Sequence, residues 1–467
     1  MKNIDVLYIH PSRSLDNTLY AFMPIGIPGL LNLLKDEGYS IYGINYSIEK
    51  SLDNTYSLKE ELENINYKVL LIDLHWYEHS YGAMEVAKMS KLIYPDIPVI
   101  IGGLTSTIFD KEILENFDCI DYILKGDSEK PLLDLVGFLL KGKGNVKDIE
   151  NISYVDNSSI ISKELTYCLK DLDSINYVDH SFLKNEKMYM YTNTIGVNLK
   201  RDKNAWVYIG RGCKHNCLYC DSARENMVTL WGRNKMIYRS PERVAKDIIE
   251  FANNGVEVVR FSHDLEMFGK EYYETVFKIL RDNNVKIGFN YDCFQLPSKH
   301  FIEQLIKTFN EEKIILDITL LSGNEEIRYK MGKLFTNERL FETLDYLNGL
   351  KCITRVYYSI NVLDEDLHTL EETMSQIYYL ANKYMNDKFY ICYQTVVMDP
   401  LALMRGLKDS DIYVELNNFM DYYKYCQNDN YNYTGYKDNM SELFQYKIDR
   451  YEEIKKVFKE KGYNNLY

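Results

Sequence analysis

Residues 213–220 read Cys213-Lys-His-Asn-Cys217-Leu-Tyr-Cys220, and this short stretch decides how the rest of the chain is interpreted. Three thiolates at a Cys-x3-Cys-x2-Cys spacing can hold a [4Fe–4S] cluster through three of its irons and leave the fourth iron open to another ligand. A structural zinc site is the alternative, but a closed zinc site needs four ligands, and His215 lies inside the tight loop between two of the cysteines. The spacing therefore favours an iron–sulfur cluster held by Cys213, Cys217 and Cys220.

The loop also has an aromatic residue, Tyr219, directly before its last cysteine, and in this it resembles the signature of the radical S-adenosylmethionine (radical SAM) superfamily. The resemblance implies an enzyme in which the open iron binds S-adenosylmethionine and an electron from the cluster cleaves the sulfonium to a 5′-deoxyadenosyl radical. It also implies an electron donor such as a flavodoxin or a ferredoxin. A cluster with an open iron would need low oxygen, so we expect an anaerobic setting.

The composition of the chain limits its location and partners. Its 467 residues are enough for two or three domains, and they include no uninterrupted apolar run of about 18 or more residues that would span a bilayer. The chain starts without the apolar stretch of a secretory signal, and its six other cysteines are scattered singly, so we expect a cytoplasmic protein in a reducing compartment. The net charge of −14 argues against a general nucleic-acid binder.

Residues 1–140 alternate short apolar runs with amphipathic stretches, which predicts an α/β domain with a doubly wound parallel sheet. The expected strands and helices are at residues 6–10, 24–37, 40–45, 69–74, 81–94, 99–103, 122–125 and 128–140. Ligands of such sheets bind at the carboxyl ends of the strands. The loops at residues 11–23, 75–80 and 103–109 are therefore the candidate contacts.

Three segments of this region resemble the cobalamin-binding, Rossmann-like domain that precedes the barrel in one subclass of radical SAM enzymes. They are Met23-Pro-Ile-Gly-Ile-Pro-Gly-Leu-Leu, Ile100-Ile-Gly-Gly-Leu-Thr-Ser-Thr and Asp121-Tyr-Ile-Leu-Lys-Gly-Asp-Ser-Glu-Lys-Pro-Leu. The glycines can simply let the chain turn, but a strand end without a Cβ would also let a flat macrocycle lie against the backbone. The resemblance implies a cobalamin site lined by Leu74, His75, Trp76, Gly102, Gly103, Leu104, Thr105, Ser106, Gly126 and Glu129.

One departure concerns the lower face of the cofactor. Methionine-synthase-like domains carry Asp-x-His-x-x-Gly after their first strand, whereas this chain has Pro11-Ser-Arg-Ser-Leu-Asp16 there. The third strand instead ends in Asp73-Leu-His-Trp-Tyr-Glu-His79. His75 would lie beneath the corrin as an axial or second-sphere group, with Trp76 shielding it, or would be an ordinary surface residue.

The rest of the chain divides into a connector at residues 141–203, a barrel at residues 204–400 and a helical tail at residues 401–467. In the barrel, strands are expected at residues 205–209, 256–261, 285–289, 314–319, 354–361 and 390–397, and Ser240-Pro241 opens a helix. Six β/α units predict a partial (β/α)6 barrel of the TIM type, with its chemistry at the strand carboxyl ends. We expect the tail, with a final amphipathic helix near residues 441–459, to cover the open side and the substrate.

The radical SAM resemblance assigns further residues to S-adenosylmethionine. The backbone of Tyr219 would approach the adenine. Where the family usually has a Gly-Gly-Glu-like motif for the amino group, this chain has Ser262-His-Asp264, so Ser262 and Asp264 are the candidates. Ser322 and Arg328 would contact ribose and carboxylate, although Arg328 would also suit a solvated helix pair with Glu325.

The reaction implied by the subclass is methyl transfer to an unreactive carbon or phosphorus centre of a small-molecule, lipid or peptide substrate. The same cofactors also support ring contraction, cyclisation or other rearrangement, and some members keep the sheet domain without using cobalamin. A corrinoid- or cluster-binding sensor without turnover is the non-enzymatic alternative. Arg233, which follows the cluster loop, would counter an anionic substrate or the charge of the cluster.

Overall fold

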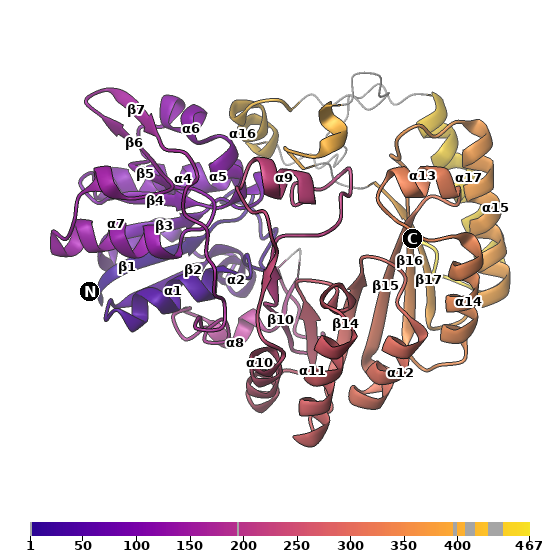
Figure 1. Cartoon of the computed structure of the whole chain (residues 1–467). Helices are drawn as coiled ribbons and strands as arrows, with labels where there is room; N and C mark the ends of the chain where they lie inside the picture. The colour runs from indigo at the N-terminus through magenta and orange to yellow at the C-terminus, as the bar shows by residue number, and fades with distance from the viewer. Residues whose placement is uncertain (1, 194–195, 396–398, 407–415, 428–441) are drawn as a thin grey trace. The chain divides into compact units, whose positions relative to one another are not determined.

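The computed structural model describes residues 2–193, 196–395, 399–406, 416–427 and 442–467. The chain forms two compact units, coloured by residue number in Figure 1. The first unit consists of Met1–Asn204, Trp231–Arg233 and Leu416–Tyr431, and the second of Ala205–Leu230, Asn234–Glu415 and Asn432–Tyr467. Among the described residues, no helix is both long enough and apolar enough to cross a membrane.

The first unit is built on one seven-stranded sheet with the order β2-β1-β3-β4-β5-β6-β7. Its first five strands pair in parallel, and they are β1 (Lys2–His10), β2 (Ile41–Asn45), β3 (Ile65–Asp73), β4 (Val99–Gly102) and β5 (Tyr122–Leu124). The order 2-1-3-4-5 is a doubly wound one whose direction reverses between β1 and β3, and the crevice of such a sheet opens at that point. The predicted fold of this region is confirmed.

Helices cover both faces of this sheet. One face carries α1 (Ile27–Asp36) and α7 (Glu129–Lys141), which pack on alternate strand residues such as Val6 and Tyr8. The other face carries α3 (Leu58–Glu63) and α4 (Ser80–Ile93). The shorter elements are α2 (Tyr46–Leu52), η1 (Tyr77–His79), α5 (Leu104–Ile108), α6 (Asp110–Asn116), η2 (Val146–Asp148), α8 (Glu186–Tyr189), β8 (Thr192–Asn193) and β9 (Gly196–Val197).

The range predicted as a connector also contributes to the sheet. Strands β6 (Ile152–Asp156) and β7 (Ser159–Ser162) form an antiparallel hairpin that pairs with β5. Asn157 and Ser158 make the two-residue turn, both with positive φ (45° and 66°), as a type I′ hairpin requires. The first sheet therefore continues past residue 140, where the sequence suggested that it would end.

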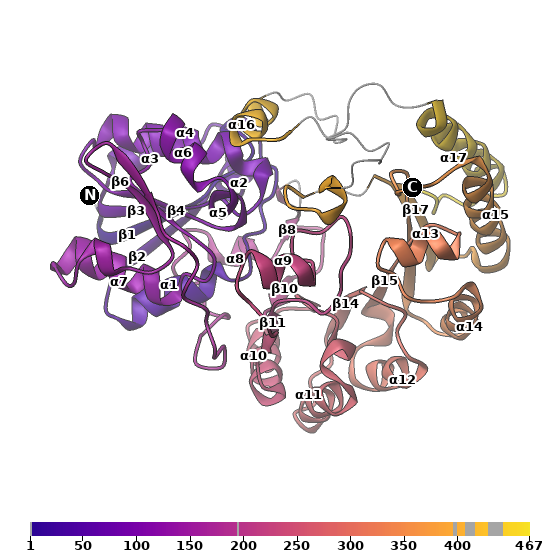
Figure 2. The same ribbon diagram turned by 45° about the horizontal axis from the view of Figure 1, so that its top comes forward.

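The second unit is an open sheet with the order β10-β13-β14-β15-β16-β17. The strands are β10 (Asn204–Val207), β13 (Val258–Phe261), β14 (Gly288–Cys293), β15 (Ile314–Leu321), β16 (Ile353–Ser359) and β17 (Phe389–Gln394), and β13 to β17 pair in parallel. Helices lie along one side of it in Figure 2: α10 (Pro241–Asn253), α11 (Lys270–Asp282), α12 (Lys299–Thr308), α14 (Asn337–Asn348) and α15 (Leu367–Tyr384). The partial barrel is confirmed, and α10 begins as predicted because Ser240 Oγ accepts from Arg243 N–H (3.3 Å).

Shorter elements complete this unit. They are β11 (Gly210–Arg211), α9 (Arg224–Thr229), β12 (Ile237–Tyr238), η3 (Leu265–Phe268), η4 (Glu311–Lys313), α13 (Glu325–Lys330) and η5 (Leu403–Gly406). The expected strand at residues 285–289 begins later, at Gly288, because the chain after α11 first turns through Asn284 (φ 55°).

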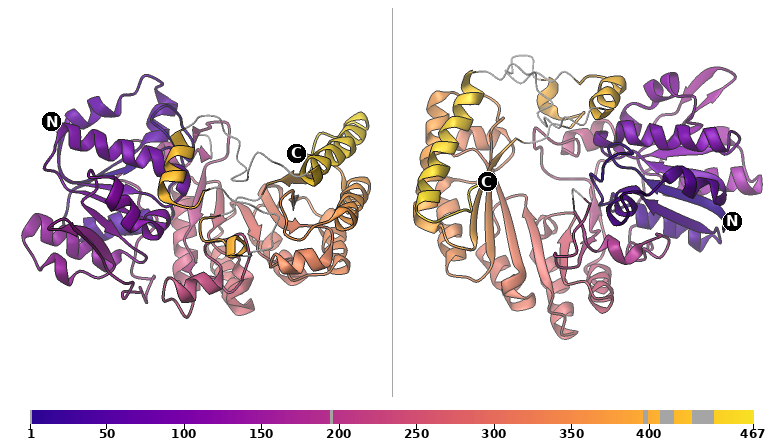
Figure 3. Two further views of the ribbon diagram at one scale, coloured as in Figure 1. Left: turned by 90° about the horizontal axis from the view of Figure 1, so that it is seen from above. Right: turned by 180° about the vertical axis from the view of Figure 1, so that it is seen from behind.

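The tail returns to both units. Helix α16 (Phe419–Gln427) packs on α4 and η1 of the first unit, and α17 (Glu442–Glu460) runs along α15 of the second, as Figure 3 shows from two further sides. The final amphipathic helix is thus close to its expected bounds, and Tyr467 pairs with Ile391 at the β17 edge (N–H to O, 2.9 Å). The Tyr- and Asn-rich stretch at residues 428–439 lies outside the described residues.

Candidate functional site

The cysteine loop lies between β11 and α9, beyond the carboxyl end of β10. Cys213, Cys217 and Cys220 are free and half-buried. The loop is fixed by its own backbone, since Cys220 N–H donates to Cys217 O (3.2 Å) and Arg224 N–H donates to His215 O (2.9 Å). Three thiols on one fixed loop at a strand end are what a cluster with three cysteine ligands needs.

The surroundings of the loop also fit a cluster. Burial, followed by the neighbouring Cys217, raises the pKa of Cys213, and burial, followed by Asp399, raises the pKa of Cys220. Thiols of this kind become thiolates when iron binds them. His215 N–H points at Cys213 Sγ (3.4 Å), and the Lys333 ammonium is buried close by, which lowers its pKa even though the sulfurs act to raise it. Backbone N–H groups and a cation near the sulfurs are favourable to an anionic cluster.

Two residues that the sequence analysis missed seat the loop. Gly332 has φ 95°, and a Cβ on it would stand 3.0 Å from Cys217 Cα and 3.2 Å from Asn216 O. On another side, Asp399 Oδ2 accepts from Asp221 N–H (3.1 Å). The Gly332-Lys333 dipeptide carries no motif that would have singled it out.

The structure engages both candidates for the amino group of S-adenosylmethionine in internal hydrogen bonds. Ser262 Oγ accepts a hydrogen bond from Ile209 N–H (3.0 Å) and lies 2.9 Å from His263 Nδ1. The second ring nitrogen of His263, Nε2, donates to Gly212 O (2.9 Å). Asp264 accepts from the Tyr291 hydroxyl and from backbone N–H groups of Glu266 (2.9 Å) and Phe294 (3.1 Å), and burial raises its pKa. These bonds brace the cluster loop and the end of β13.

The end of β15 lies against the cluster loop. Leu218 and Tyr219 pack on an apolar cluster that includes Leu321, Ile327 and Met331. Leu321 has φ 69°, a strained value for a side chain with a Cβ, and the β15–β16 register shifts just before it. Strain of this kind is characteristic of functional sites, and nothing in the sequence indicates it.

Ser322 and Arg328 follow this strained turn, and both are fully buried. Ser322 Oγ accepts from Asn324 N–H (3.1 Å), and one Arg328 Nη donates to Asn337 Oδ1, while Arg328 Nε and the other Nη have no hydrogen-bond partner. The alternative of a solvated Arg328 pairing with Glu325 is wrong, because the guanidinium is buried. Its two unpartnered nitrogens suit an anionic group of a ligand.

Arg233 is not placed as expected. It belongs to the first unit, where its guanidinium pairs with Asp127 and donates to Leu169 O (3.4 Å). The carboxylate of Asp127 also accepts from Leu169 N–H (2.7 Å). The expectation that Arg233 counters the cluster or a substrate is therefore replaced by a structural ion pair.

A row of charged side chains crosses the middle of the second sheet, and the sequence analysis missed it. Asp292, Asp317 and Arg355 stand in register on β14, β15 and β16, and Arg260 lies on the neighbouring β13. Arg355 binds Asp317 with two bonds of 2.5 Å. The pKa of Asp292 is raised to about 6, first by desolvation and next by the Asp317 carboxylate. These side chains face away from Tyr291, which packs on Phe301 of α12, so they line the helix-free side of the sheet.

In the first unit, the predicted cobalamin residues come together at adjacent strand ends. Thr105 N–H and Oγ1–H donate to His75 O (3.2 and 3.0 Å), and Ser106 N–H donates to Leu74 O (3.2 Å). Gly103 has φ 122°, and a Cβ on it would stand 2.7 Å from Leu74 O and His75 N. The space of the missing Cβ is thus taken by the chain's own backbone, and not left for a macrocycle as the sequence analysis preferred.

The remaining cobalamin candidates lie on the same rim. Gly102 ends β4, Leu104 begins α5, Gly126 (φ 59°) follows β5, and the buried Glu129 begins α7. His75 is half-buried, and burial lowers its pKa to about 4. A neutral imidazole at this rim can face a ligand or a metal.

Trp76 lies within a group of aromatic rings at the end of β3. Its indole stacks on Tyr20 (centroids 6.3 Å apart) and meets the rings of Phe22, His75 and His79 edge-on at 5.1 to 5.8 Å. Tyr20 itself has a strained φ of 58°. The strain marks the crevice between β1 and β3 as a candidate site.

Comparison with known proteins bears on both units. Residues 207–377 match the Radical SAM superfamily. The second unit carries a radical SAM domain. The cysteine loop lies inside this match, and the superfamily is one of enzymes that use an iron–sulfur cluster and S-adenosylmethionine, so the chain is an enzyme.

Two relatives and one solved structure illustrate the likeness. An uncharacterized methyltransferase of Pyrococcus horikoshii is 26% identical over 50% of this chain and 45% of its own length. The anaerobic magnesium-protoporphyrin IX monomethyl ester cyclase of Cereibacter sphaeroides is 22% identical over 79% of this chain and 58% of its own. The chain thus spans about half the length of these relatives.

The solved structure is that of TsrM, a radical S-adenosylmethionine methyltransferase from Kitasatospora setae, with cobalamin and a [4Fe–4S] cluster bound. It has a TM-score of 0.64 at 14% identity and covers 86% of this chain and 74% of that one. The two chains therefore share a fold over most of their length.

Proposed function

We propose that this chain is a cobalamin-dependent radical SAM enzyme that transfers a methyl group to an unactivated carbon or phosphorus centre. The observation that supports it best is that one chain contains both a half-buried Cys-x3-Cys-x2-Cys loop, which follows β10 and β11 of an open sheet, and a separate sheet of order 2-1-3-4-5. The fold shared with TsrM adds support. The substrate would be a small molecule, a lipid or a peptide, and a flavodoxin or ferredoxin would supply electrons.

In this proposal Cys213, Cys217 and Cys220 hold the cluster, and the loops after β3 and β4 hold the corrinoid. When bound, these groups and S-adenosylmethionine would supply a carbon-centred radical and a methyl donor. The chain's own part is to bind and orient. Arg328 offers two buried donors for a carboxylate, and Lys333 places a cation near the thiolates.

The charged row on the second sheet is the candidate surface for the substrate. Asp317 is occupied by Arg355, whereas the neighbouring Asp292 is exposed to solvent. A polar or cationic group of a substrate would suit it. The Ser262 hydroxyl and the Asp264 carboxylate stay candidates for binding the amino group of S-adenosylmethionine, although both already form hydrogen bonds within the chain.

Cyclisation is the second candidate, because the relative that aligns with 79% of this chain is named a cyclase. Both reactions require a 5′-deoxyadenosyl radical, but methylation also consumes S-adenosylmethionine as a methyl donor. Anaerobically reconstituted protein with S-adenosylmethionine and reductant should therefore release 5′-deoxyadenosine, and S-adenosylhomocysteine only if it methylates. Release of neither product would favour the sensor alternative.

The cluster assignment has its own test. Replacing Cys213, Cys217 and Cys220 together with Ala should remove the iron and sulfide and end cleavage of S-adenosylmethionine. The control is Cys352→Ala, a buried cysteine directly before β16, which should keep both the iron–sulfur content and the cleavage activity. Equal iron content in the triple variant and the wild type would contradict the assignment.

The cobalamin assignment is tested by retention. Protein incubated with hydroxocobalamin should keep about one equivalent through gel filtration, the stoichiometry of one site at the strand carboxyl ends of the sheet. We expect the cofactor's dimethylbenzimidazole to be displaced from cobalt and His75 only to line the pocket, so the cob(II)alamin spectrum should lack nitrogen superhyperfine splitting in both the wild type and His75→Ala. Splitting that is present in the wild type and lost in His75→Ala would show that His75 is an axial ligand. Failure of the protein to retain any corrinoid would rule out cobalamin as its cofactor.

A further inference from the structure

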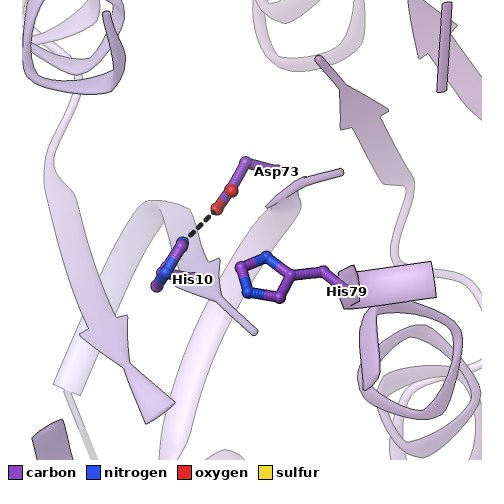
Figure 4. A group of neighbouring side chains, drawn as sticks. All are labelled: His10, Asp73 and His79. Atoms are coloured by element: carbon purple, nitrogen blue, oxygen red, sulfur yellow. Dashed lines mark hydrogen bonds and ion pairs between the residues drawn. The ribbon is translucent and has the colours of Figure 1, made fainter. Parts of the chain in front are cut away.

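A second cluster of ligand-type side chains lies in the first unit, at the switch point between β1 and β3. His10 ends β1, Asp73 ends β3 and His79 ends η1. Their side chains converge, as Figure 4 shows, with the His79 ring directed toward the His10–Asp73 pair. All three are buried, with 0%, 2% and 0% of their surfaces exposed. Radical SAM chemistry gives this group no role.

The hydrogen bonds around the cluster orient its members and leave specific atoms unused. His10 Nε2–H donates to Tyr20 O (2.8 Å), and His10 Nδ1 faces Asp73 Oδ1 (2.9 Å). Tyr8 donates its hydroxyl proton to the same Asp73 oxygen (2.7 Å). Asp73 Oδ2 and both ring nitrogens of His79 have no hydrogen-bond partner. Three buried polar atoms without a partner, side by side, indicate a missing ligand.

We propose that His10, Asp73 and His79 form a binding site for a divalent transition-metal ion, for which zinc is the expected occupant. One ligand atom from each side chain lies within 4.8 Å of the others, so small rotations of the two rings would bring them to a common ion. Two imidazoles and a carboxylate are a donor set that zinc accepts, at about 2.0–2.2 Å per ligand. No other group of three such side chains at this spacing occurs in the part of the chain that the structure describes.

The outer contacts match those of metal-binding histidines. A ligating imidazole usually donates its second N–H to a carbonyl or carboxylate, which fixes the tautomer and the ring orientation. His10 does this toward Tyr20 O, which leaves Nδ1 for the ion. Tyr8 holds one oxygen of Asp73 and leaves Oδ2 for the ion.

The ordinary alternative is aromatic packing alone. The His79 ring lies edge-on to His10, Tyr20 and Trp76 at 5.0, 5.6 and 5.8 Å between centroids. Packing accounts for the position of the ring but not for its two unpartnered nitrogens beside an unpartnered carboxylate oxygen. Enclosure by Tyr20 and Trp76 argues that the ion would be structural, tying η1 and the loop that carries His75 and Trp76 to the sheet.

The test uses the full chain without its cluster cysteines, so that thiolates at the cluster loop do not compete. In the Cys213→Ala, Cys217→Ala, Cys220→Ala background, chelator-treated protein is titrated with Co²⁺ and then with Zn²⁺. We expect one equivalent of Co²⁺ with visible ligand-field bands but no thiolate charge-transfer band, displaced by Zn²⁺. Adding His79→Ala should weaken binding by more than about 100-fold, since even an outer-shell change costs about 10–100-fold.

The matched control is His180→Ala, which removes a half-buried imidazole of the same unit that belongs neither to the proposed ligand set nor to the cobalamin candidates. It should bind Co²⁺ like its parent. If His79→Ala fails to fold, judged by circular dichroism, His79→Gln decides the matter in the same titration, since it keeps a polar side chain but loses the imidazole. Unchanged Co²⁺ binding in the His79 variant, or no binding in the parent, would overturn the proposal.

Discussion

Gly103 is a residue of the first unit at which a side chain would be both strained and crowded. It has φ 122°, and a Cβ would meet the backbone of Leu74 and His75 at 2.7 Å. Gly103→Ala should lower the unfolding free energy of this unit by about 1–3 kcal/mol or more. The control is Gly137→Ala within α7, where the nearest atom to a Cβ is Tyr39 Oη at 3.8 Å, and this change should stabilise by about 0.5–1 kcal/mol. Urea unfolding measures both, and equal stability of the two variants would contradict the packing described.

A substitution at Gly332 should impair assembly of the iron–sulfur cluster even though all three cysteines are kept. An alanine Cβ at this position would lie 3.0 Å from Cys217 Cα, and the φ of 95° is strained for any residue with a Cβ. The cysteine loop would therefore have to shift. We expect Gly332→Ala to incorporate much less iron than the wild type during anaerobic reconstitution, with a stability loss of about 1–3 kcal/mol. Gly349→Ala, where φ is ordinary and the nearest contact is 3.6 Å, should incorporate iron normally. Full iron content in Gly332→Ala would show that the loop accommodates the methyl group.

At this scale the sequence indicates candidate ligands more readily than the residues that would support them. The cysteines could be named because their spacing is itself the chemical requirement. The strain at Leu321, the close approach of Gly332 and the full hydrogen bonding of Asp264 depend on segments far apart in the chain. Local residue types do not encode such contacts.

Among the elements, α16 has the most testable role. Phe419 is fully buried, and its ring lies 5.7 Å from Phe117 and 6.1 Å from Phe109. Phe419→Ala should cost about 3–5 kcal/mol, because it opens a cavity between α16 and the sheet domain. Hydrogen exchange resolved by peptide should show faster opening of α4 and α6, whereas Lys424→Ala, an exposed position on the same helix, should change nothing measurable. Unchanged exchange in Phe419→Ala would mean that α16 does not stabilise this face.

Elements with a clear period were predictable, and elements defined by distant partners were not. The strands that became β1 to β5 are continuous apolar runs, as buried parallel strands should be. The β6–β7 hairpin has weaker local patterning and is a strand pair because β5 offers an edge. The sequence analysis named no helix at the position of α16, and aromatic contacts with α4 and η1 explain where it packs.

For the molecule as a whole, acid should destabilise the first unit. Burial lowers the pKa of His180 to about 4 from an ordinary 6.5, although its Nδ1–H bond to Val178 O opposes this. Between these values the unfolded chain binds a proton that the folded chain does not, so the unfolding free energy falls as the pH drops from about 6.5 toward 4. Stability measured at several pH values should show a shallower loss in His180→Gln. An identical slope in both proteins would exclude a contribution from His180.

The division into a sheet domain and a partial barrel could be foreseen, because the strand–helix rhythm restarts at the cysteine loop. The sequence did not indicate that two later segments of the chain would belong to the first unit. Residues 231–233 and 416–427 belong to the first unit although both follow the start of the barrel. Arg233 illustrates the consequence, since its partner Asp127 precedes it by about a hundred residues.

The late synthesis of α16 also affects how the chain folds during translation. Tyr77, Phe109 and Phe117 leave the exit tunnel about 300 residues before the helix that covers them. At about 5–20 residues per second, this aromatic surface waits roughly 15–60 s in the cytosol of the producing cell. Nascent chains would therefore expose this aromatic surface to chaperones for most of their synthesis. Rare codons between the two segments would lengthen the wait, and recoding them should raise the yield of folded protein.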